Sequence, residues 1–187
     1  LDGPVGIVVQ GNYAYVASIF DSGFQIIDIS DPTNPIGRGE ITDGASGATE
    51  LNGAYKLTIQ GKYAYVTSFG DNGLQIIDIS DPDSPVGLGE VDYAGAPVLN
   101  VVTDIVVAGN YAYLTGAASN GVQIIDISDA DNPIGAGAII DGQRGATRLG
   151  SAYGIAIQGN YLYVTANTED ALQILSLPTF TSPTANI

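Results

Sequence analysis

Residues 10–16 read QGNYAYV, and nearly the same seven residues return as QGKYAYV at 60–66, AGNYAYL at 108–114 and QGNYLYV at 158–164. All four copies carry a Gly-Asn or Gly-Lys pair at their second and third positions, which suits a tight turn, followed by a run of aromatic and aliphatic residues. Successive copies lie 48 to 50 residues apart. Self-similarity at such a period indicates a fold that repeats one small unit.

A second motif follows the first in every repeat. It reads GFQIIDISDP at 23–32, GLQIIDISDP at 73–82, GVQIIDISDA at 121–130 and, less faithfully, ALQILSLP at 171–178. With the apolar run before each Gly turn and the short segment after the prolines, each repeat reads as four short strands, here called A to D. Pro and Gly interrupt the windows in which a helix would form. Four-stranded units at this period are typical of β-propeller blades.

We therefore predict an all-β fold: a β-propeller of four visible four-stranded blades in a single domain, residues 1–187. The blades are expected at about 3–42, 52–92, 100–141 and 151–187. The fourth repeat replaces the strand D sequence of the others, so we expect a modified outer strand within 179–187. Both faces of the predicted strands are largely apolar, which fits sheets that are covered on both sides.

Together, the Gly-Asn-Tyr-Ala-Tyr-Val block, the Gly-Leu-Gln-Ile-Ile-Asp-Ile-Ser-Asp-Pro block and the Asn-Pro after it resemble the LVIVD repeat. The resemblance covers essentially the whole chain and implies a β-propeller of the kind found in secreted or surface proteins of bacteria and archaea. It carries no catalytic motif. Three arrangements stay open: a closed four-bladed ring, part of a larger ring, and several chains that pack blade against blade.

The composition restricts the chemistry. The chain has no Cys and no His, which excludes thiolate and imidazole nucleophiles, bases and metal ligands. Its formal net charge of −15 opposes binding to nucleic acid and to anionic membrane surfaces. No apolar run approaches the roughly 20 residues of a membrane-spanning helix, so we expect no membrane insertion.

The best candidate binding residues lie where strand A of each repeat begins. In a propeller the B–C turns and D–A loops share one face, and the D–A loops of this chain are its longest and most varied, so that face is the expected binding face. Tyr55, Lys56, Asp104 and Tyr153 should line the mouth of the central channel there, with Arg144 and Arg148 in an adjoining loop. These six residues are the predicted ligand site. The alternative, which the sequence favours, is a structural Lys56–Asp104 pair between blades.

Acidic residues repeat once per blade at Asp28, Asp78 and Asp126. We interpret them as acceptors of backbone hydrogen bonds at the C–D turn, in preference to a ring of Ca²⁺ ligands. No catalytic residue, metal site or cofactor is predicted. A surface Ca²⁺ ion at a residue such as Asp21, Asp71 or Asp170 stays open.

These observations favour a non-enzymatic extracellular or cell-surface propeller that acts as a binding or assembly scaffold. Its expected partner is a protein or a polysaccharide, with self-association through blade faces or loops as a further option. Two alternatives are a structural subunit of a surface layer or filament, and a carboxylate- or metal-dependent lyase or hydrolase with its site at the channel mouth. The last would require two or more converging acidic groups.

Overall fold

The computed structural model describes residues 1–177 and consists almost entirely of antiparallel sheet. Three sheets have four strands in chain order, and the fourth has three strands within the described residues. Blade 1 contains β1 (Pro4–Gln10), β2 (Tyr13–Ser18), β3 (Gly23–Asp28) and β4 (Ile36–Thr42). Blade 2 contains β5 (Ala54–Gln60), β6 (Tyr63–Ser68), β7 (Gly73–Asp78) and β8 (Val86–Val91).

Blade 3 contains β9 (Val102–Ala108), β10 (Tyr111–Gly116), β11 (Gly121–Asp126) and β12 (Ile134–Ile140). Blade 4 contains β13 (Ala152–Gln158), β14 (Tyr161–Ala166), the short 3-10 helix η1 (Asn167–Glu169) and β15 (Ala171–Ser176). The predicted all-β propeller blades are thereby confirmed. The outer strand expected within 179–187 lies outside the described residues. In residues 1–177 no helix is both long and apolar enough to cross a membrane.

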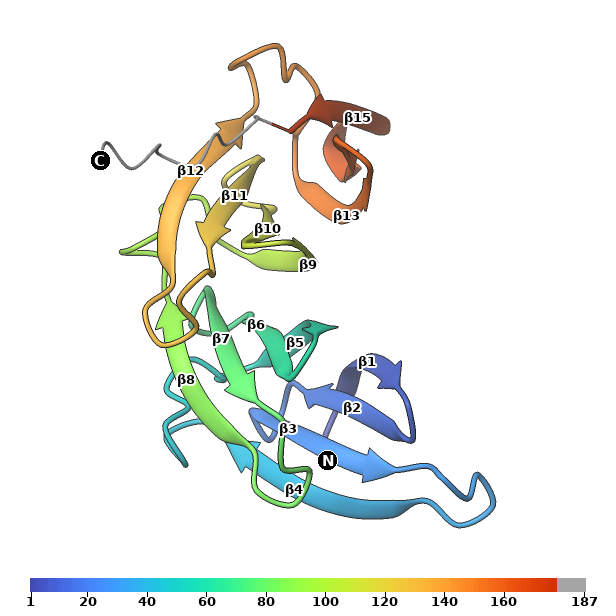
Figure 1. Ribbon diagram of the computed structural model, residues 1–187. Coiled ribbons are helices and arrows are strands. Elements are labelled where there is room, and N and C mark those ends of the chain that lie inside the picture. Colours follow the sequence, from blue (N-terminus) through green and yellow to red (C-terminus); the bar gives the residue numbers. More distant parts are fainter. Residues whose placement is uncertain (178–187) are drawn as a thin grey trace, which may run out of the picture.

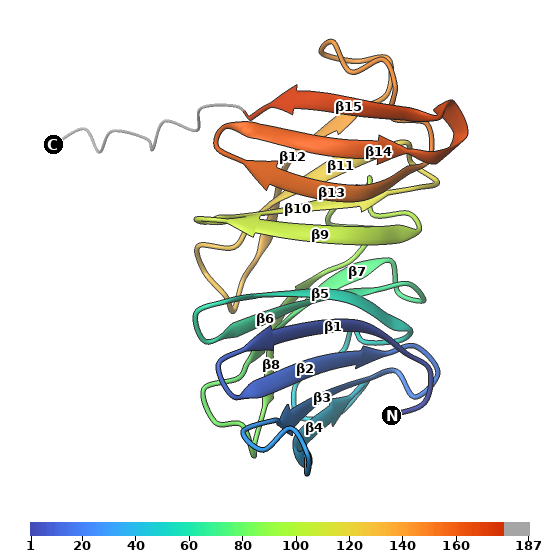
Figure 2. The same ribbon diagram turned by 90° about the vertical axis from the view of Figure 1, so that its right-hand side faces the viewer.

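The four blades follow one another along an open arc (Figure 1). The innermost strands β1, β5, β9 and β13 stack side by side, as Figure 2 shows from the channel side, while β4, β8 and β12 form the outer rim. Blades 1 and 4 lie at the two ends of this arc. The chain therefore does not close as a four-bladed ring, one of the three arrangements that the sequence left open.

The hydrophobic core lies between the blades rather than inside any one of them. We call the side of a blade that faces the next blade in the chain its forward face, and the opposite side its rear face. Between blades 1 and 2, for example, Phe24 and Ile26 of the forward face pack with Leu57 and Val66 of the rear face. Two equivalent clusters fill the spaces between blades 2 and 3 and between blades 3 and 4. Both faces of a middle blade are buried, which explains why its strands are apolar on both sides.

In blades 1 to 3 one carboxylate fixes the turn after strand C. Asp28 Oδ1 accepts a hydrogen bond from the Ser30 amide (2.9 Å), and Asp78 and Asp126 make the same contact two residues ahead. The backbone and side-chain hydrogen bonds from Ser30 lower the pKa of Asp28. The geometry supports the interpretation of these residues as turn acceptors, because each carboxylate serves its own turn.

A glutamine, buried in blades 2 and 3 and partly buried in blade 4, ties each D–A loop to the following blade. Gln75 Oε1 accepts hydrogen bonds from the amides of Thr49 (2.9 Å) and Glu50 (3.2 Å), which precede blade 2. Gln123 and Gln173 repeat this contact in blades 3 and 4. Because the glutamine is the third residue of every strand C motif, the repeat sequence itself determines where each loop is anchored.

Truncation of a core residue should be far more damaging than truncation of a rim residue. Leu74 is fully buried between blades 2 and 3. Leu74→Ala is expected to lower the free energy of unfolding by about 2–5 kcal/mol, because it leaves a cavity in a close-packed interface. Val86 lies exposed on the outer strand of the same blade, and Val86→Ala should change stability by less than about 0.5 kcal/mol. Urea unfolding of both variants tests this, and equal losses would contradict it.

Candidate functional site

Irregular pairing marks the channel mouth, where strand A of each blade begins. The register shifts between Ala54 and Leu57 in blade 2 and between Ala152 and Ile155 in blade 4. Threonine hydroxyls on the neighbouring strand accept hydrogen bonds from the backbone amides at these irregularities. Thr67 accepts from the Lys56 amide (3.0 Å), and Thr165 accepts from the Gly154 amide (2.8 Å). Bulges of this kind redirect side chains and are common beside binding sites.

Two predicted site residues meet across the channel. The hydroxyls of Tyr55 in blade 2 and Tyr153 in blade 4 lie 3.3 Å apart, although 98 residues separate them in the chain. The Tyr55 ring also lies 6.1 Å from the ring of Phe69, and Lys56 Nζ lies 5.3 Å from the Tyr55 centroid. The hydrogen bond to Tyr153 and, secondarily, burial raise the pKa of Tyr55. The mouth thus carries a cluster of three aromatic rings and one ammonium group.

Asp104 has a structural partner, but not the one that the sequence favours. Its Oδ2 accepts a hydrogen bond from the Ile155 amide of the next blade (3.0 Å), and its Oδ1 accepts one from Ile105 (3.0 Å). The ion pairs of the described chain do not include one between Lys56 and Asp104. The expected pair is therefore wrong, because Lys56 lies over the Tyr55 ring while Asp104 is occupied by backbone amides.

The two arginines lie apart from the tyrosine pair. Arg144 is exposed, with a left-handed backbone (φ 50°), and lines a separate cavity of about 330 Å³ with residues of β11, β12 and β15. Arg148 is exposed on the same loop and does not line this cavity. It does not line the second cavity, described below, that opens beside Tyr153 either. The structure thus brings together Tyr55, Lys56 and Tyr153, but not the arginines.

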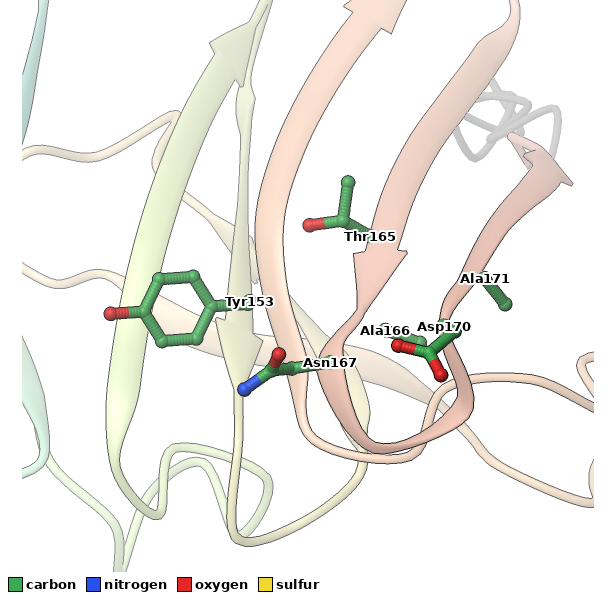
Figure 3. A pocket seen from close by; sticks show the side chains of 6 residues that line it. All are labelled: Tyr153, Thr165, Ala166, Asn167, Asp170 and Ala171. Carbon is green, nitrogen blue, oxygen red and sulfur yellow. The ribbon is translucent and has the colours of Figure 1, made fainter.

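A cavity of about 500 Å³ opens beside Tyr153 in blade 4, lined by Tyr153, Thr165, Ala166, Asn167, Asp170 and Ala171. In Figure 3 the Tyr153 ring lies on one side and Asp170 and Ala171 on the other, with Thr165 and Asn167 between them. The sequence analysis missed Thr165 and Asn167 and considered Asp170 solely as a Ca²⁺ ligand. The sequence signal that could have identified them is the B–C turn of blade 4, because residues 167–170 read NTED and differ from the turns of the other blades.

The chemistry of this cavity is that of hydrogen bonding. It offers a phenol, an alcohol, a carboxamide and one carboxylate, together with small apolar side chains. The lyase or hydrolase hypothesis requires two or more converging acids, and Asp170 is the sole acid among the lining residues. Across residues 1–177, no group of three acidic side chains is arranged to hold a metal ion.

The carboxyl group of Glu50, in the D–A loop before blade 2, lies in surroundings that disfavour its charged form. Glu50 Oε2 is buried without a hydrogen-bond partner in the described structure and lies close to Gly73. Burial, reinforced by the charges of Asp71 and Asp92, raises the pKa of Glu50 from 4.5 to about 7. The folded protein therefore binds a proton more tightly than the unfolded chain does between these pH values.

Stability should therefore fall as pH rises from 4.5 to about 7, and Glu50→Gln should remove that loss. Because the Glu50 side chain is only partly buried and solvent screens its charge, we expect a gain of about 1 kcal/mol above neutral pH, which disappears at acidic pH. Urea unfolding across this range measures it. Glu40→Gln, which removes an exposed carboxylate of blade 1, controls for the change in net charge. An equal gain in both variants would contradict the explanation.

Loss of the Asp104 carboxylate should weaken the contact between blades 3 and 4. Asp104→Ala leaves the Ile155 amide without its charged acceptor and is expected to lower the free energy of unfolding by about 1–3 kcal/mol. Lys56→Ala serves as the matched control and should change it by less than about 0.5 kcal/mol. Thermal and urea unfolding of both variants check this, and an unaffected Asp104→Ala variant would rule out the structural role.

Solved structures with similar folds are β-propellers of low sequence identity. A putative 6-phosphogluconolactonase from Bacteroides uniformis aligns with a TM-score of 0.74 and 15% identity over 94% of this chain and 51% of its own. A periplasmic gluconolactonase from Pseudomonas aeruginosa gives 0.73 and 12% over 92% and 49%. The computationally designed protein Ika4 gives 0.62 and 11% over 95% and 92%. This chain spans about half the length of the two natural proteins, and these likenesses concern the fold alone.

No curated protein sequence matches the chain. The family model of the LVIVD repeat matches it four times, at residues 5–43, 53–92, 101–139 and 149–175. These segments coincide with the four blades and with the motifs from which the sequence analysis began. The chain belongs to the LVIVD repeat family.

Proposed function

We propose that this protein is a non-enzymatic binding scaffold that recognises a neutral glycan at the channel mouth. The observation that carries the proposal is the joining of Tyr55 and Tyr153 across the channel, beside a cavity lined by hydroxyl, carboxamide and carboxylate groups. Aromatic faces pack against the apolar face of a sugar ring, and polar side chains bond its hydroxyls. Recognition sites commonly combine apolar surface with a few polar groups in this way.

Charge favours an uncharged sugar over an acidic one. The protein carries a net charge of −15, and Asp170 lies in the cavity lining while both arginines lie elsewhere. An anionic polysaccharide would be repelled by this field. A protein partner that contacts the D–A loops is the second form of the binding-scaffold proposal, since these loops vary most between repeats.

The proposal includes an extracellular or cell-surface location. Its support is the family resemblance together with the similar fold of a protein from Pseudomonas aeruginosa that is described as periplasmic. The proposal also excludes a catalytic step. A single carboxylate in the cavity does not provide the acid pair of a glycoside hydrolase, although lactonase-like propellers share the fold.

The test is calorimetric titration of the full chain with a panel of neutral gluco-, manno-, galacto- and xylo-oligosaccharides. At least one series should bind, and Tyr153→Ala and Asn167→Ala should each weaken binding by about tenfold, equivalent to about 1.4 kcal/mol. Tyr93→Ala removes a tyrosine of similar exposure from a D–A loop outside the cavity and should leave the affinity unchanged.

The same mixtures should be assayed for new reducing ends over time. Binding without hydrolysis supports the scaffold, whereas hydrolysis that Asp170→Asn abolishes would overturn it in favour of the enzyme. Failure of every neutral oligosaccharide to bind, or equal loss of binding in Tyr93→Ala, would also overturn the proposed site.

A further inference from the structure

Within residues 1–177 the forward face of blade 4 is uncovered, although its strand C carries the residues that the other blades bury. Leu172 and Ile174 are 59% and 51% exposed. Their counterparts in blade 1, Phe24 and Ile26, are fully buried against blade 2. The same two positions are buried in blades 2 and 3. Strand C of blade 4 therefore presents the same forward-facing apolar residues that receive the next blade elsewhere in the chain.

The rear face of blade 1 is uncovered in the complementary way. Ile7 is 67% exposed and Leu1 51% exposed, whereas their counterparts in blade 2, Leu57 and Leu51, are buried against blade 1. The chain thus ends at one side in a forward face and at the other in a rear face. These are the two halves of the interface that it already forms three times within itself.

Hydrogen bonds between a B–C turn and the next blade, here called latches, indicate the same complementarity of the two end faces. In the B–C turns of blades 1 to 3 the residue before strand C accepts a hydrogen bond from an amide of the next blade. The pairs are Ser22 with Gly53 (3.1 Å), Asn72 with Val101 (2.7 Å) and Asn120 with Ser151 (2.7 Å). All six residues have left-handed backbones. The fourth acceptor position is Asp170 (φ 47°), and the donor position before blade 1 is Gly3 (φ 66°).

A second latch joins the A–B turns at the opposite end of the blades. Gln10 donates from its carboxamide to the Gly61 carbonyl (3.2 Å), and Gln60 donates to the Gly109 carbonyl (2.9 Å). Blade 3 has Ala108 at this position and lacks the latch. Blade 4 restores it with Gln158, which is exposed, and the matching acceptor position in blade 1 is Gly11. Both latches thus retain an acceptor or donor at each end of the arc.

We propose that a second copy of this chain occupies both end faces, so that two four-bladed arcs pack head to tail into a closed eight-bladed ring. The forward face of each blade 4 would cover the rear face of the other chain's blade 1, with Asp170 accepting from Gly3 and Gln158 donating to Gly11. One chain covers about half of the similar natural propellers, so two copies supply the length of one such chain. A heterologous interface that closes after two copies gives a discrete assembly instead of a filament.

Ring closure would also complete the candidate site. Asp170 and Ala171 form the wall of the 500 Å³ cavity that adjoins the uncovered forward face, so blade 1 of the second chain would cover that side. Tyr153 and Thr165 would continue to face the channel. The inference does not depend on glycan binding, because the assembly is measured without any ligand.

The experiment measures the molar mass of the full chain by sedimentation and light scattering over the micromolar range. The expected mass is twice 19.2 kDa. Ile174→Glu on the forward face and Ile7→Glu on the rear face should each reduce it to one chain, since each substitution places a charge in both interfaces of the ring. Ile134→Glu, at an exposed position of the outer strand β12, is the matched control and should leave the mass unchanged. Circular dichroism confirms that each variant is folded.

Cross-linking tests the register without disturbing the apolar faces. The chain has no cysteine, so Cys residues introduced by Gln158→Cys and Asn12→Cys are the sole thiols. A short bismaleimide should link the doubly substituted chain into a two-chain species, and neither single substitution should do so. A one-chain mass for the unmodified protein, a series of masses beyond two chains, loss of assembly in one face variant alone, or absence of the cross-link would each overturn the proposal.

Discussion

Apolar packing of one blade on the next is the interaction on which this structure depends. Each sheet is too thin to bury its own side chains, so the three hydrophobic clusters form solely where a forward face meets a rear face. A single fully buried leucine or isoleucine side chain contributes about 1.5–3 kcal/mol to such burial. The stability of a blade therefore depends on its neighbours, as expected of repeat proteins whose units contact mainly the next unit.

Polar groups add direction to this packing. An apolar face alone would tolerate sliding. The glutamine that anchors each D–A loop, and the hydrogen bonds from the start of one blade to the B–C turn of the blade before it, fix one blade at one position on the next. Several of the residues in these latches have left-handed backbones. Such conformations are unfavourable for residues other than glycine, asparagine and aspartate, so they persist where the surrounding contacts require them.

The candidate site arises where the repeat departs from uniformity. The beginning of strand A carries Tyr55 and Lys56 in blade 2, Asp104 in blade 3 and Tyr153 in blade 4, while the strands below it remain nearly identical. The same apolar scaffold can therefore hold different side chains at the channel mouth without loss of packing. This separation of scaffold from site is a common property of propellers and other repeat folds.

The sequence by itself determined the repeat, the four strands of each blade, the turn role of the per-blade aspartates and the strand positions at the channel mouth. These follow from local pattern, because turn residues and alternating apolar residues act within a few positions of each other. It did not determine which of those side chains meet. Tyr55 and Tyr153 come together from 98 residues apart because the arc curves across blade 3. Lys56 and Asp104 do not pair, because one backbone amide of Asp104's own strand and one of the next blade occupy its carboxylate. Whether the arc closes is likewise a property of blade-to-blade geometry. The repeat pattern is the same in a buried and in an exposed blade face, and only the tertiary structure shows which faces of residues 1–177 have no neighbour.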